Sequence, residues 1–167
     1  MFKVFALVAL FATGSIASAI SSAVVVKKGV APFDGTTLGV VQPVGRCGGV
    51  GTPLQLRISG CEGYCELQPG SIYNCEEDFM PSMAAPSLIL KIEICMSAGF
   101  CMIILETELA NSSVQPGFIY TAKYSIVPND ILSGQTVEFK AYISASDTMR
   151  LEICVSAFVD ILFGVGR

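Results

Sequence analysis

The amino-acid sequence predicts an all-β protein built as a sandwich of two antiparallel sheets. From Val40 onward, apolar residues recur at every second position, which is typical of strands with one buried and one solvated face. A solvated face is a feature of antiparallel sheets, and turn residues divide the runs into short segments, as in sandwiches. The chain is 52% hydrophobic and 14% charged, so it has more apolar residues than a minimal core of this size needs. This excess indicates an internal cavity or an apolar ligand.

The first nineteen residues are expected to form a secretory signal peptide. Lys3 precedes an apolar run at 4–12, and residues 17–19, Ala-Ser-Ala, match a small-x-small cleavage pattern. The alternative is a signal anchor, because residues 4–26 carry no charge and are numerous enough to span a bilayer. Residues 20–39 contain many turn formers and are predicted to be an extended N-terminal arm before a single domain at 40–167.

Five alternating runs carry the strand prediction. Each run places apolar residues on one face and mostly polar residues on the other: 53–58, 87–96, 117–126, 136–143 and 150–161. Turn sequences lie between or beside them: QPG at 68–70, SAG at 97–99, QPG at 115–117, PND at 128–130 and SGQ at 133–135. The segment at 80–87 is expected to be a loop, because prolines at 81 and 86 bracket it.

The seven cysteines all follow the predicted signal peptide, so an oxidising compartment would favour disulfides between them. A metal site is not expected, because the chain has no histidine and no pair of CxxC motifs. Redox catalysis is disfavoured as well: Cys61 and Cys65 have three residues between them instead of two, and no helix is indicated there.

Residues 47–161 resemble the ML family of lipid-recognition domains. Family members include the lysosomal cholesterol carrier lost in one form of Niemann-Pick type C disease and the group 2 mite allergens. No single motif is specific, but their order and spacing are. They are RCGG (46–49), SGCEGYCELQPGSIYNCEEDF (59–79), LKIEI (90–94), QPGFIYTAKYSIVP (115–128), TVEFKAYI (136–143) and EICVSAFVDI (152–161).

The resemblance implies an immunoglobulin-like sandwich whose sheets separate to enclose an apolar tunnel for a sterol, a fatty acid or a phospholipid tail. It also implies two disulfides, Cys47–Cys154 and Cys61–Cys65. The sequence departs from the family at the third pair, because residues 106–117 contain no cysteine. Instead, a three-residue turn at 97–99 would place Cys95 directly opposite Cys101, which predicts a disulfide between them.

Cys75 is then left unpaired. By strand parity it faces inward with Tyr73 and Phe79, either as a buried free thiol or as one half of an intermolecular disulfide. Glu77 shares this inward parity, which is unfavourable for a carboxylate. Either the strand bulges at this position, the interpretation that we favour, or Glu77 binds the head group of a ligand.

These features together predict a secreted lipid-binding or lipid-transfer protein that needs no cofactor. It would transfer an apolar ligand from water to the space between its two sheets. Phe100 and Met102 are expected at the tunnel mouth. Each lining residue could equally be ordinary sandwich core. The expected lining is the inward-facing set Leu56, Ile58, Tyr73, Phe79, Leu90, Ile92, Ile94, Phe118, Tyr120, Tyr124, Val137, Phe139, Ile153 and Val155.

The alternative function is an interaction or innate immune recognition module on the same fold. Such a module would be distinguished by an exposed rim that is either apolar or basic. The residues that could form a basic rim are Lys27, Lys28, Arg46 and Arg57. An enzyme is not expected, because without histidine there is no Ser–His or Cys–His nucleophile, and the acidic residues at 76–78 alternate between faces.

Charge and modification complete the expectations. Without the signal peptide, fourteen acidic residues face nine basic ones, which disfavours nucleic acid and anionic lipid head groups as partners. Asn111 begins an N-x-S/T triplet beside a turn and is expected to be glycosylated. We expect a monomer, located outside the cell or in a lysosome-like compartment, with transient membrane contact.

Overall fold

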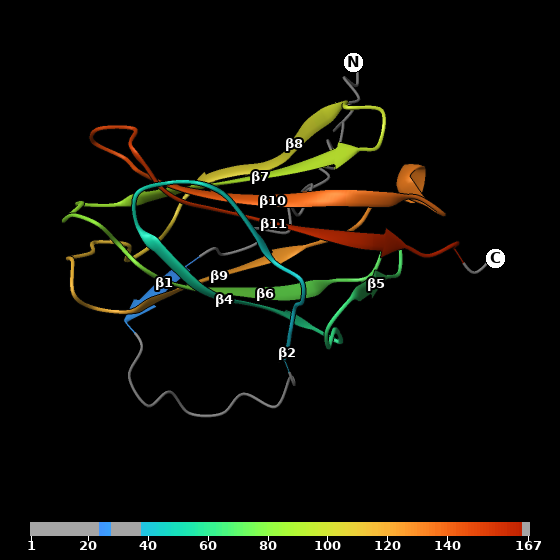
Figure 1. Cartoon of the computed structure of the whole chain (residues 1–167), viewed down its shortest axis with the longest axis horizontal. Helices are drawn as coiled ribbons and strands as arrows, with labels where there is room; N and C mark the ends of the chain where they lie inside the picture. Colours follow the sequence, from blue (N-terminus) through green and yellow to red (C-terminus); the bar gives the residue numbers. More distant parts are fainter. Residues whose placement is uncertain (1–23, 28–37, 165–167) are drawn as a thin grey trace, which may run out of the picture.

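The computed structural model describes residues 24–27 and 38–164. The predicted signal peptide and most of the predicted arm lie outside these residues. The described chain forms two packed sheets, seen edge-on as two layers in Figure 1. In order across the first sheet, the strands are β1 (Val24–Lys27), β9 (Tyr120–Ile126), β6 (Tyr73–Met80), β4 (Thr52–Ser59) and β2 (Leu38–Val40).

The second sheet contains six strands, and a short 3₁₀ helix, η1 (Asp130–Leu132), precedes its strand β10. In addition to its main order, β5 (Cys65–Leu67) pairs with the C-terminal part of β11 in parallel. The main order is β3 (Gly45–Gly48), β11 (Leu151–Ile161), β10 (Thr136–Ala145), β7 (Leu88–Met96) and β8 (Cys101–Glu108).

This architecture confirms the predicted all-β sandwich, and among the described strands every pair except β5 with β11 is antiparallel. The alternation works as expected in β7, where Leu88, Leu90 and Ile92 are fully buried between the sheets. The opposite face of β7 carries Lys91 and Glu93, which form an ion pair of 2.8 Å. In the described part of the chain, no helix is long and apolar enough to cross a membrane.

The structure corrects several sequence-based details. Val24–Lys27, within the predicted arm, pairs with β9 and so belongs to the first sheet. Alternation along 53–58 places Leu54 on the inward face with Leu56 and Ile58, but the register between β4 and β6 shifts at Leu54 and exposes it. Phe118 was also assigned inward, but β9 begins two residues later and the side chain is 43% exposed.

Alternation along 150–161 places Glu152 on the outer, solvated face, but the structure buries it. Its carboxylate accepts hydrogen bonds from the Arg150 guanidinium and from the backbone N–H of Ser82, at 2.7 Å. The 80–87 segment therefore covers this part of the outer face of β11. Full pairing of this kind is the condition under which a carboxylate is tolerated away from water.

The three expected disulfides are present: Cys47–Cys154, Cys61–Cys65 and Cys95–Cys101. The last pair sits directly opposite across the β7–β8 hairpin. Its turn contains Gly99 with a φ of 81°, a conformation that glycine adopts without steric cost. Cys75 is a buried free thiol, which is the first of the two alternatives predicted for this residue.

Candidate functional site

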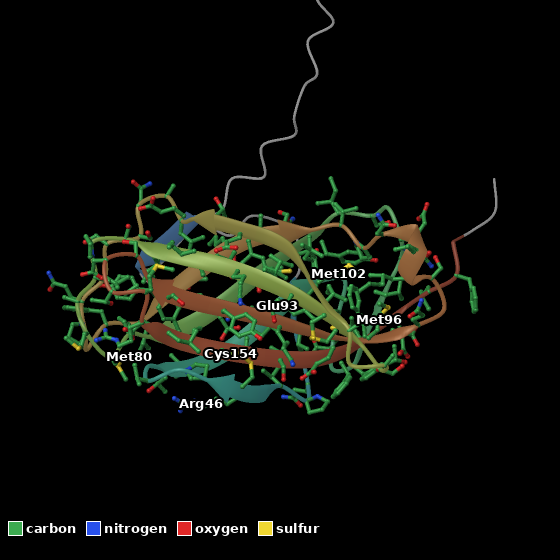
Figure 2. All side chains as sticks on the ribbon, turned by 90° about the horizontal axis from the view of Figure 1, so that it is seen from above. Arg46, Met80, Glu93, Met96, Met102 and Cys154 are labelled. Carbon is green, nitrogen blue, oxygen red and sulfur yellow. A yellow bond between two sulfur atoms is a disulfide. The ribbon has the colours of Figure 1, made fainter. Side chains whose placement is uncertain are left out.

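A cavity of about 150 Å³ lies between the sheets at the end of the sandwich that carries η1. We call it the end cavity. Every lining side chain is apolar except that of Asn129. Figure 2 shows Met102, one of the lining residues, toward this end and Met80 at the opposite end. The lining comprises Leu67, Ile94, Met102, Ile104, Ile126, Val127, Pro128, Asn129, Ile131, Leu132, Phe139, Val159 and Ile161.

The connection between β9 and β10 closes the end cavity on one side. Asn129 caps η1, with its side-chain oxygen accepting a 2.9 Å hydrogen bond from the backbone N–H of Ile131. This turn directs Leu132 inward, where it is buried, and leaves Ile131 pointing to solvent. This side of the cavity is thus formed by a short connecting segment, whereas the other lining residues lie on strands of both sheets.

The rim of the end cavity is apolar and exposed. Ile104, Val127 and Ile131 line the cavity and are 43%, 52% and 72% exposed. Apolar residues that are both exposed and adjacent to a cavity are typical of an entrance for an apolar ligand or of a contact surface.

The structure divides the predicted lining residues into several groups. Ile94 and Phe139 line the end cavity, while Leu56 and Val155 line a second cavity described below. Tyr73 is half-buried against the core, and Phe118 lies on the surface. The other eight pack in the hydrophobic core: Ile58, Phe79, Leu90, Ile92, Tyr120, Tyr124, Val137 and Ile153.

Met102, expected at the tunnel mouth, does line the end cavity, whereas Phe100 is exposed and outside its lining. Most of the remaining lining residues were missed by sequence reasoning, and the largest group of them comes from the stretch 126–132. The PND turn indicated that this stretch was a connection, but no periodic pattern there shows which side chains turn inward.

The second cavity, which we call the side cavity, has a volume of about 330 Å³. It opens beside β2 and β3 and extends inward to Glu77 on β6. Its lining mixes apolar side chains with a few polar ones: Val40, Val41, Gln42, Val44, Gly45, Arg46, Pro53, Leu54, Gln55, Leu56, Glu77 and Val155.

Glu77 is 1% exposed, and the predicted bulge is wrong at this position. Glu77 pairs in regular register with Leu56 on β4 and with Ala122 on β9, so its side chain points between the sheets. Burial raises its pKa well above the ordinary value, and the neighbouring Asp78 carboxylate adds to this effect while Arg57 opposes it.

The basic residues proposed for a recognition surface are partly neutralised. Arg57 forms a 2.8 Å ion pair with Asp78 and another with Glu76, which fixes it on the outer face of the first sheet. Lys28 lies outside the described residues, and of Lys27 only the backbone, in β1, is described. Within the described residues, no group of three or more potential metal ligands lies close together.

Asn111, the predicted glycosylation site, is exposed in a turn with a φ of 54°. The adjacent Ser112 is buried, where its hydroxyl donates to the Leu109 carbonyl at 2.6 Å and accepts from the Leu88 N–H at 2.8 Å. The turn therefore presents the asparagine outward while the next residue fixes it to the sandwich.

Comparison with known proteins supports the fold assignment. A Niemann-Pick type C2 protein from the Japanese carpenter ant has a TM-score of 0.57 and 15% identity, covering 70% of this chain and 97% of that one. The C-terminal domain of Wzt has a TM-score of 0.54 and 17% identity, covering 75% and 82% of the two chains. No protein-family model and no curated protein matches the chain. At these identities, the likeness shows a shared fold.

Proposed function

We propose that the protein is a secreted carrier of an apolar small molecule, which it holds between its two sheets. The observation that carries this proposal is the end cavity, with its apolar lining and exposed apolar rim. Transfer of a ligand from water to such a lining contributes about 0.8 kcal/mol per buried methylene.

The size of the cavity narrows the ligand class. Its volume of about 150 Å³ is below the roughly 300–1,000 Å³ of a typical small-molecule site, although an apolar cavity of this size can bind benzene. It therefore accommodates the end of a fatty-acid or phospholipid chain. A sterol would require the exposed Val127 and Ile131 to move outward with the β9–β10 connection.

Three further observations support this proposal. The sequence resembles the ML family of lipid-recognition domains, and the fold is shared with an ant Niemann-Pick type C2 protein. Three disulfides are typical of an oxidising compartment, which supports an extracellular or lysosome-like location for the domain after removal of residues 1–19. Glycosylation of the exposed Asn111 belongs to the same proposal.

Displacement of a fluorescent fatty acid by unlabelled fatty acids of increasing length tests the proposal. We expect affinity to rise about fourfold per methylene until the cavity is filled, because each methylene contributes a constant transfer free energy. Affinity that does not depend on chain length would refute binding by burial of the chain.

A matched pair of variants assigns the binding to the end cavity. Met102→Trp places a larger side chain in the cavity lining and should weaken binding at least tenfold, an effect of about 1.4 kcal/mol. Ile103→Trp adds similar bulk at the next residue, which is exposed and outside the lining. Equal losses in the two variants would contradict the assignment.

A further inference from the structure

Glu77 has a property that the other buried carboxylates described do not share. Asp78 accepts hydrogen bonds from Arg57 and Thr121, and Glu152 accepts them from Arg150 and a backbone N–H. Both carboxylate oxygens of Glu77 are buried without a hydrogen-bond partner among the described residues. An unpaired polar group in the interior is costly, so it requires an explanation.

A second unpaired group lies on the same inward face of the first sheet. The hydroxyl of Tyr124 on β9 is also buried without a partner. Cys75 lies opposite Tyr124 in the register of β6 and β9, and Glu77 is two residues further along β6 on the same inward face. Two orphaned polar groups on one face of one sheet indicate a place arranged for polar contact.

The side cavity reaches Glu77. Glu77 belongs to the lining of this cavity, although its two carboxylate oxygens are buried, and Val41, Leu56 and Val155 are among its aliphatic neighbours in the lining. Its volume of about 330 Å³ falls within the range of small-molecule sites. Of the polar lining residues, Gln42, Arg46 and Gln55 are exposed and Glu77 is buried among aliphatic side chains. A buried polar group beside aliphatic side chains is what a site needs to orient an apolar ligand.

We propose that the side cavity binds an apolar small molecule with a hydrogen-bond-donating head group, an alcohol or an amine, and that this head group contacts the Glu77 carboxyl. The site is separate from the end cavity, and the inference goes beyond the carrier function proposed above, because it assigns a second ligand position and the chemistry of its head group.

The hydrogen-bonding capacity of the Glu77 carboxyl determines which ligand head groups it can bind. An ionised carboxylate is only an acceptor, and a neutral carboxyl keeps acceptor capacity beside its one O–H donor. An alcohol is therefore satisfied by either form, while an ammonium pairs with the ionised form. A carboxylate or phosphate head group would place like charge beside the ionised form of Glu77 and could accept only the single O–H of the neutral form, so it is disfavoured.

Arg46, at the rim of the side cavity, does not reverse the preference for a hydrogen-bond-donating head group over an anionic one. Its guanidinium donates to the backbone carbonyls of Gly49 at 2.5 Å and Gly51 at 2.9 Å. These bonds hold it at the edge of the sandwich, where Figure 2 shows it, while Glu77 lies at the inner end of the cavity.

Three ligands with the same chain, 1-dodecanol, dodecylamine and dodecanoic acid, test the inference by calorimetric titration at pH 7. In the Met102→Trp background, in which the end cavity is blocked, the protein should bind the alcohol, the amine or both at least tenfold more tightly than the acid. Glu77→Leu should remove this preference. Glu77→Gln should weaken the amine selectively, because an amide accepts a hydrogen bond but cannot pair with a cation.

Two controls separate this site from the rest of the molecule. Glu76→Gln changes the adjacent carboxylate, which is on the outer face in an ion pair with Lys123, and should leave the head-group preference intact. Met102→Trp blocks the end cavity and should also leave it intact. If chain-length-dependent binding is lost in Met102→Trp while the preference persists, the two sites are independent.

Several results would overturn the inference: binding of none of the three ligands, equal affinity for the acid, or an unchanged preference in Glu77→Leu. A preference limited to the alcohol or to the amine would support it and identify the donor. Circular dichroism verifies that Glu77→Leu is folded, and if that variant does not fold, the amine affinity of Glu77→Gln decides.

Discussion

Replacement of Glu77 by glutamine should make the protein more stable at neutral pH. Burial raises the pKa of Glu77 well above its ordinary value of 4.5. The native state therefore retains a proton on this carboxyl at pH values at which the unfolded chain has released it. Glutamine has nearly the same shape and stays neutral at every pH.

The sign and the size of the effect follow from this difference in proton binding. The stability associated with Glu77 is fully present below pH 4.5 and is lost as the pH rises toward the native pKa. Within that window, each pH unit lowers the free energy of unfolding of the wild type by up to about 1.4 kcal/mol. Glu77→Gln escapes this loss, so the difference between the two proteins should grow with pH.

The groups that surround Glu77 do not produce the same dependence. Cys75 and Tyr124 share its face, and burial raises the pKa of both, so they stay neutral across the acid and neutral range. Leu56 on the neighbouring strand and Val155 on the opposite sheet are apolar. The growth of the difference with pH therefore reports on Glu77.

Urea unfolding of both proteins from pH 4 to pH 8 measures the effect. Glu76→Gln is the control: hydrogen bonds from Lys123 and Arg57 outweigh burial and lower the pKa of Glu76, so its stability contribution is present above pH 4.5 and is lost as the pH falls. That variant should be less stable than the wild type at neutral pH. A difference between Glu77→Gln and the wild type that is constant with pH would refute the reasoning.

Three other predictions concern stability and reactivity. Replacing Cys47 and Cys154 by alanine should lower the free energy of unfolding by about 4–5 kcal/mol in urea denaturation, because this disulfide joins residues 107 positions apart; a loss below that from the disulfide spanning four positions would contradict this. Arg150→Met should cost about 2 kcal/mol in the same assay, because it removes a charged donor from the buried Glu152; unchanged stability would count against that role. Cys75 should react with a maleimide only after unfolding, because it is buried and its pKa is raised. Mass spectrometry that finds the maleimide adduct on the native protein would contradict this.

The alternation of side chains made much of the sandwich predictable. In β7 and β10 the period of two identified which residues face inward, because successive side chains on a strand point to opposite faces. The same rule placed Cys75 and Glu77 inward, as the structure has them. For Glu77, however, the cost of burying a carboxylate without a partner favours a bulge, and the regular register of β6 contradicts that bulge.

Local irregularities limited the rest of the prediction. The extra residue at Leu54 and the late start of β9 after Phe118 depend on pairing with distant strands, which a periodic pattern does not reveal. The end cavity depends on how the β9–β10 connection folds around η1, so its lining at Val127 and Ile131 could not be read from alternation. The residues predicted to face inward therefore identified the hydrophobic core more reliably than they identified the linings of the two cavities.

The most direct test of the carrier function is native mass spectrometry of the protein purified from a secreting culture, followed by solvent extraction and identification of the bound molecule. The carrier account predicts a stoichiometric apolar ligand that the Met102→Trp variant fails to retain. A protein that is empty, and that also fails to take up a fluorescent fatty acid or sterol, would contradict the account and favour a recognition module on the same fold.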